Sequence, residues 1–268
     1  MKIAFYTLGC KVNQYETQAL EQMFSARGHV LVPFEEQADA YIINTCTVTA
    51  VSDKKSRNVI RRVRKDNPDA VIAVCGCYPQ THPDDMAALS VDLVSGTGDR
   101  TGFVDLLERT MAERSPITAL DDAMKRRIFE TLPAGGLEGR TRSMLKVEDG
   151  CVNFCTYCII PFARGPVRSQ PLCEAVAQTK QLTAQGYREL VITGIEISSW
   201  AEISGTAVPS SICWRPSAPP LPSAASVWVL WSLAPSPRSS APGLPNCPIC
   251  VPTSIFPCSR AATLSSSG

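Results

Sequence analysis

The chain has 268 residues, and its 26 Lys and Arg residues against 25 Asp and Glu residues give a net charge of +1 at pH 7. This near-neutral balance excludes a protein that binds nucleic acid through overall positive charge, so any RNA-binding surface must be local. Because no apolar export signal precedes the 12 cysteines, we expect a cytoplasmic protein without membrane segments, whose cysteines are thiols or metal ligands.

Short apolar runs alternate with helical patterns along the first part of the chain. Such runs indicate buried parallel strands, and their alternation with helices predicts a doubly wound parallel-sheet α/β domain. The predicted strands are residues 2–8, 40–44, 70–74 and 91–95. The predicted helices between and after them are residues 13–27, 52–65 and 101–114.

Three cysteines follow predicted strands directly. Cys10 comes after the first strand, Cys46 after the second and Cys77 after the third. Because the carboxyl ends of parallel strands share one edge of the sheet, where ligands bind, we expect these thiols to converge on one site. Three converging thiols suit a metal or an iron–sulfur cluster, although free cysteines are also found as small buried packing residues.

A second cysteine pattern follows a stretch that reads as a linker. A predicted strand at residues 141–147 leads into CVNFCTYC at residues 151–158, and a helix at 173–185 and a strand at 189–193 come after it. Three thiolates can hold three irons of a [4Fe-4S] cluster and leave the fourth iron open, whereas structural zinc sites use four protein ligands. The CxxxCxxC spacing of Cys151, Cys155 and Cys158 therefore favours an open iron–sulfur cluster over zinc.

This motif, with Tyr157 before its last cysteine, is similar to the signature of radical S-adenosylmethionine (SAM) enzymes. Its surroundings, EDGCVNFCTYCIIPFARGPVRS at residues 148–169, resemble the tRNA methylthiotransferases. LGCKVNQYET at 8–17, NTCTVT at 44–49, DKKSRNVIRR at 53–62 and GCYPQ at 76–80 resemble the branch acting on N6-threonylcarbamoyladenosine (t6A), the MtaB type. The resemblance covers about residues 1–200.

The resemblance implies a radical SAM enzyme that converts t6A at position 37 of tRNA to its 2-methylthio derivative. It implies SAM and two [4Fe-4S] clusters as cofactors, which carry most of the chemistry. The expected partners are tRNA, an electron donor such as flavodoxin or ferredoxin, and a sulfur donor; no catalytic side chain is assigned. Tyr157, Gly194 and Glu196 mark the expected SAM region. The implied ligands are Cys151, Cys155 and Cys158 for the radical SAM cluster, and Cys10, Cys46 and Cys77 for the auxiliary cluster.

A base beside the anticodon lies in a single-stranded loop and can be splayed into a pocket. The best candidate for contacts to the RNA backbone is the helical stretch 54–65, which has seven basic residues in twelve. The same run also fits an ordinary solvated helix face. The candidate RNA contacts are Lys54, Lys55, Arg57, Arg61, Arg62, Arg164 and Arg168.

The composition changes at about residue 200. Residues 201–268 contain 15 Ser and 12 Pro but only four charged side chains. We hypothesise a frameshift near the codons of Ser199 and Trp200, because the neighbouring reading frame of the tail permits phrases that resemble later barrel segments of the family. The tail is then disordered or non-native, and this chain, with an incomplete barrel, is expected to be inactive.

Four segments result from these patterns: an auxiliary-cluster domain at 1–115, a linker at 116–140, an incomplete radical SAM (β/α) barrel at 141–200, and the tail at 201–268.

Two alternatives for function stay open. One is a methylthiotransferase of another substrate, isopentenyladenosine in tRNA or a ribosomal protein. The other is a non-catalytic fragment that binds a cluster or zinc.

Overall fold

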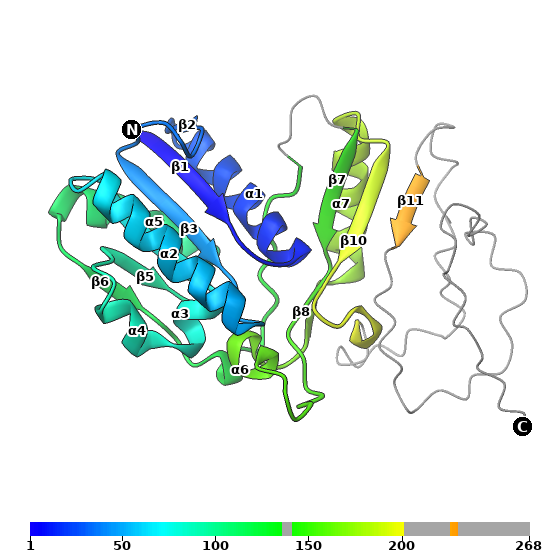
Figure 1. The fold of residues 1–268 in the computed structure, drawn as a ribbon. Helices are drawn as coiled ribbons and strands as arrows, with labels where there is room; N and C mark the ends of the chain where they lie inside the picture. The colour runs from blue at the N-terminus through cyan, green and yellow to red at the C-terminus, as the bar shows by residue number, and fades with distance from the viewer. Residues whose placement is uncertain (136–140, 201–225, 230–268) are drawn as a thin grey trace, which may run out of the picture. The chain divides into compact units, whose positions relative to one another are not determined.

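The computed structural model describes residues 1–135 and 141–200 and the backbone of residues 226–229. The first part of the chain forms a six-stranded parallel sheet with the order β2-β1-β3-β4-β5-β6 (Figure 1). This arrangement confirms the expected doubly wound α/β fold. The strands are β1 (Lys2–Thr7), β2 (Val30–Val32), β3 (Ala40–Thr45), β4 (Val71–Gly76), β5 (Leu93–Ser95) and β6 (Ile117–Ala119).

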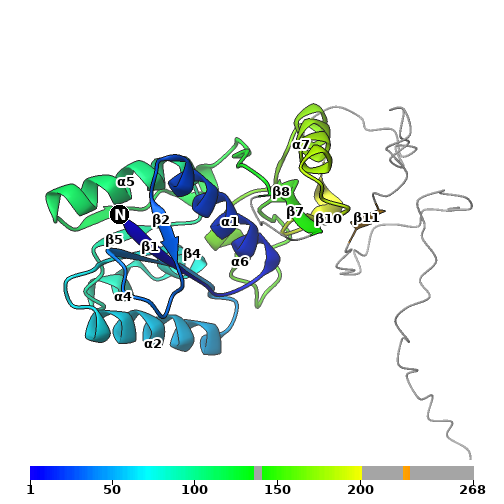
Figure 2. The same ribbon diagram turned by 90° about the horizontal axis from the view of Figure 1, so that it is seen from above.

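Helices cover both faces of this sheet (Figure 2). Alternate residues of β3 point to opposite faces, so Ile42 packs against the helices of one face and Ile43 against the helix of the other. The two resulting cores are buried, which explains why β1, β3 and β4 read as nearly continuous apolar runs. The helices are α1 (Lys11–Ala26) and α5 (Arg100–Glu113) on one face, α2 (Ala50–Asp66) on the other, and the short α3 (Cys77–Thr81) and α4 (Pro83–Ala87).

The part of the chain that follows begins a second, smaller parallel sheet of order β11-β10-β7. It also contains a two-stranded antiparallel pair, β8 with β9, on either side of the CxxxCxxC loop. The elements are η1 (Ala123–Lys125), β7 (Arg142–Lys146), β8 (Glu148–Asp149), α6 (Ile160–Arg164), β9 (Arg168–Ser169), α7 (Leu172–Ala184), β10 (Glu189–Thr193), η2 (Ile197–Ser199) and β11 (Ser226–Val229).

Two strands of the large sheet were not predicted. β2 and β6 are three-residue strands at its edges, too short for a periodic pattern to reveal. The predicted tail at 201–268 lies outside the described residues, except for β11. All described residues fall in one compact unit, and no helix among them is both long and apolar enough to span a membrane.

Candidate functional site

The three N-terminal cysteines lie at the carboxyl ends of three neighbouring strands. Cys10 follows β1 and immediately precedes α1, Cys46 follows β3, and Cys77 follows β4 as the first residue of α3. The order β2-β1-β3 means that the chain changes direction across the sheet between β1 and β3, and ligands of open parallel sheets bind at such a switch point. The structure thus places the thiols at the shared edge, while their role as ligands stays a prediction.

The loops that carry these thiols are in close contact. Gly9 has a φ of +114°, and a Cβ added to it would lie 2.8 Å from the Cys46 Cβ. The Cys10 thiol donates to Asn13 Oδ1 over 3.6 Å. Burial raises the pKa of the Cys77 thiol to about 11, and the nearby Cys10 contributes to the increase. Cys77 is therefore a neutral thiol in the metal-free chain and must lose its proton to bind a metal.

The thiols of Cys10, Cys46 and Cys77 suit a cluster held by thiolates, although their side chains are not arranged around a metal ion in this structure. Among the described residues, no group of three or more Cys, His, Asp or Glu side chains is arranged to hold a metal ion. Two polar atoms near these thiols are buried without a hydrogen-bond partner in the described part of the chain, Thr47 Oγ1 and Arg164 Nε. Thr47 is one residue after Cys46, and the Arg164 guanidinium interacts electrostatically with Cys77 and Cys10. Soft thiol donors beside a cation and unsatisfied polar atoms are compatible with an anionic iron–sulfur group.

The second cysteine set lies in the loop between β8 and α6. The Cys151 amide donates to the Gly165 carbonyl over 3.0 Å, so both ends of the loop are held together. Cys155 is exposed, while Cys151 and Cys158 are half-buried. The pKa of Cys151 is raised by burial, with smaller contributions from the charges of Glu196 and Cys158.

This loop and the helix α6 that follows it carry exposed aromatic side chains. Tyr157 is 91% exposed, and the rings of Phe154 and Phe162 meet edge to face at 5.9 Å. The predicted SAM residue Tyr157 thus points into solvent.

Gly194 and Glu196 lie in the loop after β10, next to the base of the CxxxCxxC loop. The Glu196 amide donates to Glu148 Oε2 over 2.6 Å, and a Cβ on Gly194 would lie 2.6 Å from the same oxygen. Burial raises the pKa of Glu148 to about 8. The Glu196 carboxylate accepts hydrogen bonds from the hydroxyls of Ser198 and Ser199.

A buried cluster of charged side chains, which the sequence did not predict, joins the first sheet to the CxxxCxxC segment. Glu16 on α1 accepts bonds from Arg164 Nη1 at 2.5 Å, Arg100 Nη2 at 2.9 Å and Lys146 Nζ at 3.2 Å. Burial raises the pKa of Glu16, but these three cations outweigh that effect and hold it well below its ordinary value. The buried charge cluster consists of Glu16, Arg100, Lys146, Asp149, Arg164 and Arg168.

This cluster corrects the predicted RNA contacts of Arg164 and Arg168. Arg164 is fully buried and Arg168 is 6% exposed. Arg168 Nη1 donates to the carbonyls of Arg164 and Pro166, and its Nη2 lies 3.4 Å from Asp149. Both guanidiniums are enclosed and bonded within the protein, so the structure does not support contact with RNA. No local sequence pattern marked this cluster, because the buried face of α1 carries polar Asn13 and Thr17 as well as Glu16.

The basic residues of α2 differ from one another in exposure. Arg57 is half-buried and donates to the Tyr78 hydroxyl over 2.7 Å. The other four predicted contacts, Lys54, Lys55, Arg61 and Arg62, are exposed. They form a basic surface on the helix that leads away from Cys46, and their role in binding RNA stays a prediction.

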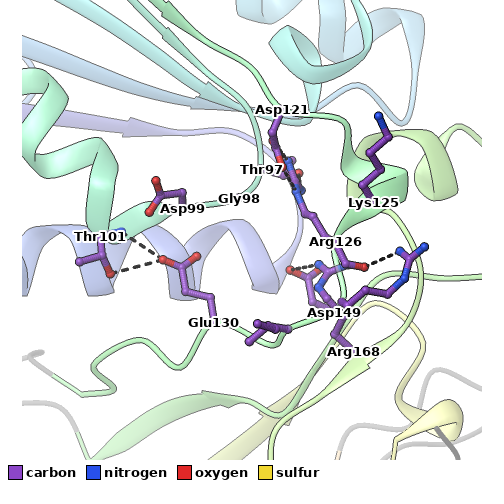
Figure 3. A pocket seen from close by; sticks show the side chains of 12 residues that line it. Thr97, Gly98, Asp99, Thr101, Asp121, Lys125, Arg126, Glu130, Asp149 and Arg168 are labelled. Atoms are coloured by element: carbon purple, nitrogen blue, oxygen red, sulfur yellow. Dashed lines mark hydrogen bonds and ion pairs between the residues drawn. The ribbon is translucent and has the colours of Figure 1, made fainter.

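A cavity of about 630 Å³ lies beside the buried charge cluster (Figure 3). Thr97 and Asp99 line it from the loop after β5, and Asp149 and Arg168 line it from the β8–β9 pair. Two acid–base pairs lie among its lining residues, Arg126 with Asp121 and Arg168 with Asp149. No cysteine is among the described residues that line it, so it does not coincide with either cysteine set.

Comparison with known proteins gives a family match over residues 2–96, to the family described as "Uncharacterized protein family UPF0004". The threonylcarbamoyladenosine tRNA methylthiotransferase MtaB of Bacillus subtilis is 49% identical over 201 residues, which are 75% of this chain and 45% of that protein. A tRNA-2-methylthio-N6-dimethylallyladenosine synthase of Carboxydothermus hydrogenoformans is 31% identical over 203 residues, 73% of this chain and 46% of that protein. The chain thus spans about half the length of the curated relatives it matches.

Among solved structures, the chain is similar to the radical S-adenosylmethionine methyltransferase TsrM from Kitasatospora setae, which was solved with its tryptophan substrate and a SAM analogue bound. The TM-score is 0.50 at 16% sequence identity, and the match covers 74% of this chain and 48% of that one. At this identity the likeness concerns the fold alone.

Proposed function

We propose that the chain is an MtaB-type tRNA methylthiotransferase, which it resembles over 75% of its length, and that its residues serve the conversion of t6A at position 37 of tRNA to the 2-methylthio derivative. The observation that carries the proposal is the pair of cysteine sets. One lies at the carboxyl ends of β1, β3 and β4, and the other is the CxxxCxxC loop. The 49% identity to the Bacillus subtilis protein favours t6A as the substrate.

In this proposal each cysteine set holds a [4Fe-4S] cluster. Cys10, Cys46 and Cys77 hold the auxiliary cluster, and Cys151, Cys155 and Cys158 hold the radical SAM cluster. When bound, the clusters and SAM supply the radical and sulfur chemistry. A reduced flavodoxin or ferredoxin, a sulfur donor and a cytoplasmic location are part of the same proposal.

The protein's own residues position these groups and exclude water from them. Glu148 fixes the loop that carries Glu196 through the backbone amide of that residue. This bond ties the predicted SAM loop to a residue three positions before Cys151. The exposed basic side chains of α2 would hold the phosphates of the anticodon stem-loop, while a base beside the anticodon leaves its stack at little cost.

A second substrate is supported by one observation. The dimethylallyladenosine synthase from Carboxydothermus hydrogenoformans is 31% identical over nearly the same length, so tRNA carrying that modified adenosine is the alternative. Deleting the gene and analysing the tRNA nucleosides by mass spectrometry separates the two. We expect 2-methylthio-t6A to disappear and t6A to accumulate. Loss of the 2-methylthio dimethylallyl nucleoside would establish the alternative, and an unchanged nucleoside profile would refute both.

The change of composition near residue 200 leads to a related proposal, that the reading frame shifts near the codons of Ser199 and Trp200. Residues 201–268 contain only four charged side chains, and this composition supports the proposal. The match to the Bacillus subtilis protein is 201 residues long, which agrees with a change of frame near residue 200. Independent sequencing of this region tests the proposal. A missing nucleotide is expected, and an intact frame in independent reads would refute it.

A further inference from the structure

Arg164 extends from α6 to the helix that follows Cys10. Its Nη2 donates to Asn13 Oδ1 over 2.7 Å, and its Nη1 donates to Glu16 Oε1 over 2.5 Å. Asn13 and Glu16 are three residues apart on α1 and therefore lie on the same face of that helix. The planar guanidinium carries several N–H donors in a fixed fork and can bond both partners, whereas the single ammonium of a lysine cannot reproduce this geometry.

Asn13 in turn bonds the two loops that carry Cys10 and Cys46. Its Nδ2 donates to the Leu8 carbonyl and to the Thr45 carbonyl, over 2.9 Å each. Leu8 lies two residues before Cys10, and Thr45 lies immediately before Cys46. Because an amide group can rotate by half a turn, the donors at Oδ1 favour one orientation. Arg164, at 2.7 Å, is the shorter of its two donors, since the Cys10 thiol lies at 3.6 Å. Arg164 therefore helps to keep the Nδ2 group directed at both carbonyls.

The surroundings of Asn13 leave little freedom for another arrangement. Asn13 is fully buried. A Cβ on Gly9 would lie 2.8 Å from the Cys46 Cβ and 2.9 Å from Asn13 Nδ2. The loop of Gly9, the Asn13 amide and Cys46 are thus packed together. A displaced amide has to shift one of the two cysteine-bearing loops.

We propose that Arg164 is a positioning residue for Cys10 and Cys46, although it follows the other cysteine set in the chain. It orients the Asn13 amide, and the amide holds the two loops together. The effect on cluster binding rests on the proposed function, while the positioning of the thiols does not. Arg164 thereby connects the geometry of the N-terminal cysteines to the segment that carries the CxxxCxxC motif.

The test is alkylation of the native, metal-free chain with iodoacetamide at one fixed pH, followed by mass spectrometry at each cysteine. Arg164→Lys keeps a cation near Glu16 but loses the fork, and Asn13→Ala removes the amide. We expect Cys46, which is 6% exposed in the parent, to react about fivefold faster in both variants. Cys75, fully buried within β4, should stay protected and serves as the internal reference for unfolding.

Arg100→Lys is the matched control. Arg100 is also fully buried and bonds Glu16 over 2.9 Å, but its other contacts are the Gly96 carbonyl and the Cys75 thiol, and not Asn13. Because Cys75 is a neighbour of Arg100, far-UV circular dichroism is the reference for unfolding in this variant. Labelling of Cys46 should therefore stay at the parental rate in this variant. The double variant of Arg164 and Asn13 should label no faster than Asn13→Ala alone, because both changes remove the same connection.

Three results would overturn the proposal: an unchanged rate at Cys46 in Arg164→Lys, an equal increase in Arg100→Lys, or an increase that Cys75 shares. Iron binding adds a separate readout in a chain whose Cys151, Cys155 and Cys158 are replaced by Ala. After anaerobic reconstitution, Arg164→Lys should retain less iron there than its parent. If that parent holds no iron, the proposed auxiliary cluster fails, while the labelling result still decides the positioning role.

Discussion

Gly76 is the last residue of β4, directly before Cys77, and its φ is +101°. A Cβ at this position would lie 2.4 Å from the Thr45 carbonyl oxygen and 2.6 Å from Asn44 Oδ1. Both atoms belong to the end of β3, which leads to Cys46. Glycine is therefore required here for its conformation and for the close approach of two strands that carry cysteines.

Gly76→Ala should lower the free energy of unfolding by about 3 kcal/mol, because left-handed strain adds to a clash with backbone. Gly28→Ala is the matched control, since its φ is +84° but no atom lies within 4 Å of the added Cβ. It should cost only about 1 kcal/mol for the conformation. Urea unfolding of both variants measures the difference, and equal losses would contradict the steric explanation.

Glu148 illustrates how burial sets the protonation of a single side chain. It is fully buried, its Oε1 has no hydrogen-bond partner among the described residues, and burial raises its pKa from 4.5 to about 8. Between these two values the folded chain keeps a proton that the unfolded chain releases. The contribution of Glu148 to stability is therefore greatest below the unfolded pKa and decreases as the pH rises through this window.

Glu148→Gln should remove this pH dependence, because glutamine stays neutral and still offers one oxygen to the Glu196 amide. We expect the variant to gain stability relative to the parent between pH 5 and pH 8, by at most about 1.4 kcal/mol per pH unit. Urea unfolding at several pH values checks this. A constant difference between the two proteins across that range would show that Glu148 does not carry the extra proton.

At the scale of elements, α2 combines a buried apolar face with an exposed basic one. Val59, Ile60 and Val63 pack on the sheet, and Thr49 caps the helix by accepting a bond from the Ser52 amide over 3.1 Å. Arg61 and other basic residues of this helix remain exposed. A stable helix can therefore present these charges to a polyanion without losing packing.

Arg61→Ala should weaken binding of the chain to tRNA and reduce the slope of log K against log salt by about 0.7 to 0.9, the contribution of one phosphate contact. Arg109→Ala is the control, because Arg109 is exposed on α5, which covers the opposite face of the sheet. Filter binding at several salt concentrations measures both slopes. Equal effects of the two substitutions would indicate general electrostatics and remove α2 as the RNA surface.

The long elements could be predicted because their patterns are local. The strand predicted at 189–193 is β10 without change, and the helix predicted at 52–65 is α2 with two more residues at its start and one at its end. β2 and β6 could not be predicted, because three-residue edge strands depend on their neighbours for pairing. Local periodicity therefore locates the strands whose ends carry the cysteines, but not the edges of the sheet.

At the scale of the whole molecule, the contact between the first sheet and the CxxxCxxC segment is ionic and buried. Two anions, Glu16 and Asp149, face four cations of the buried charge cluster. Buried ions are costly unless they are compensated, and in the proposed function the excess positive charge lies next to thiolate-bound clusters. The buried charge cluster could not be predicted from the sequence, because Glu16 and Arg164 are 148 residues apart and neither belongs to a local pattern.

Two iron–sulfur clusters on two separate cysteine sets are the feature on which the proposed function depends most directly. The measurement is the iron and sulfide content of the chain after anaerobic reconstitution, for the parent and two triple variants. One variant replaces Cys10, Cys46 and Cys77 by Ala, and the other replaces Cys151, Cys155 and Cys158. We predict about eight iron atoms per parent chain and about four in each variant. Bound zinc in place of iron, or an iron content that neither variant lowers, would contradict the assignment.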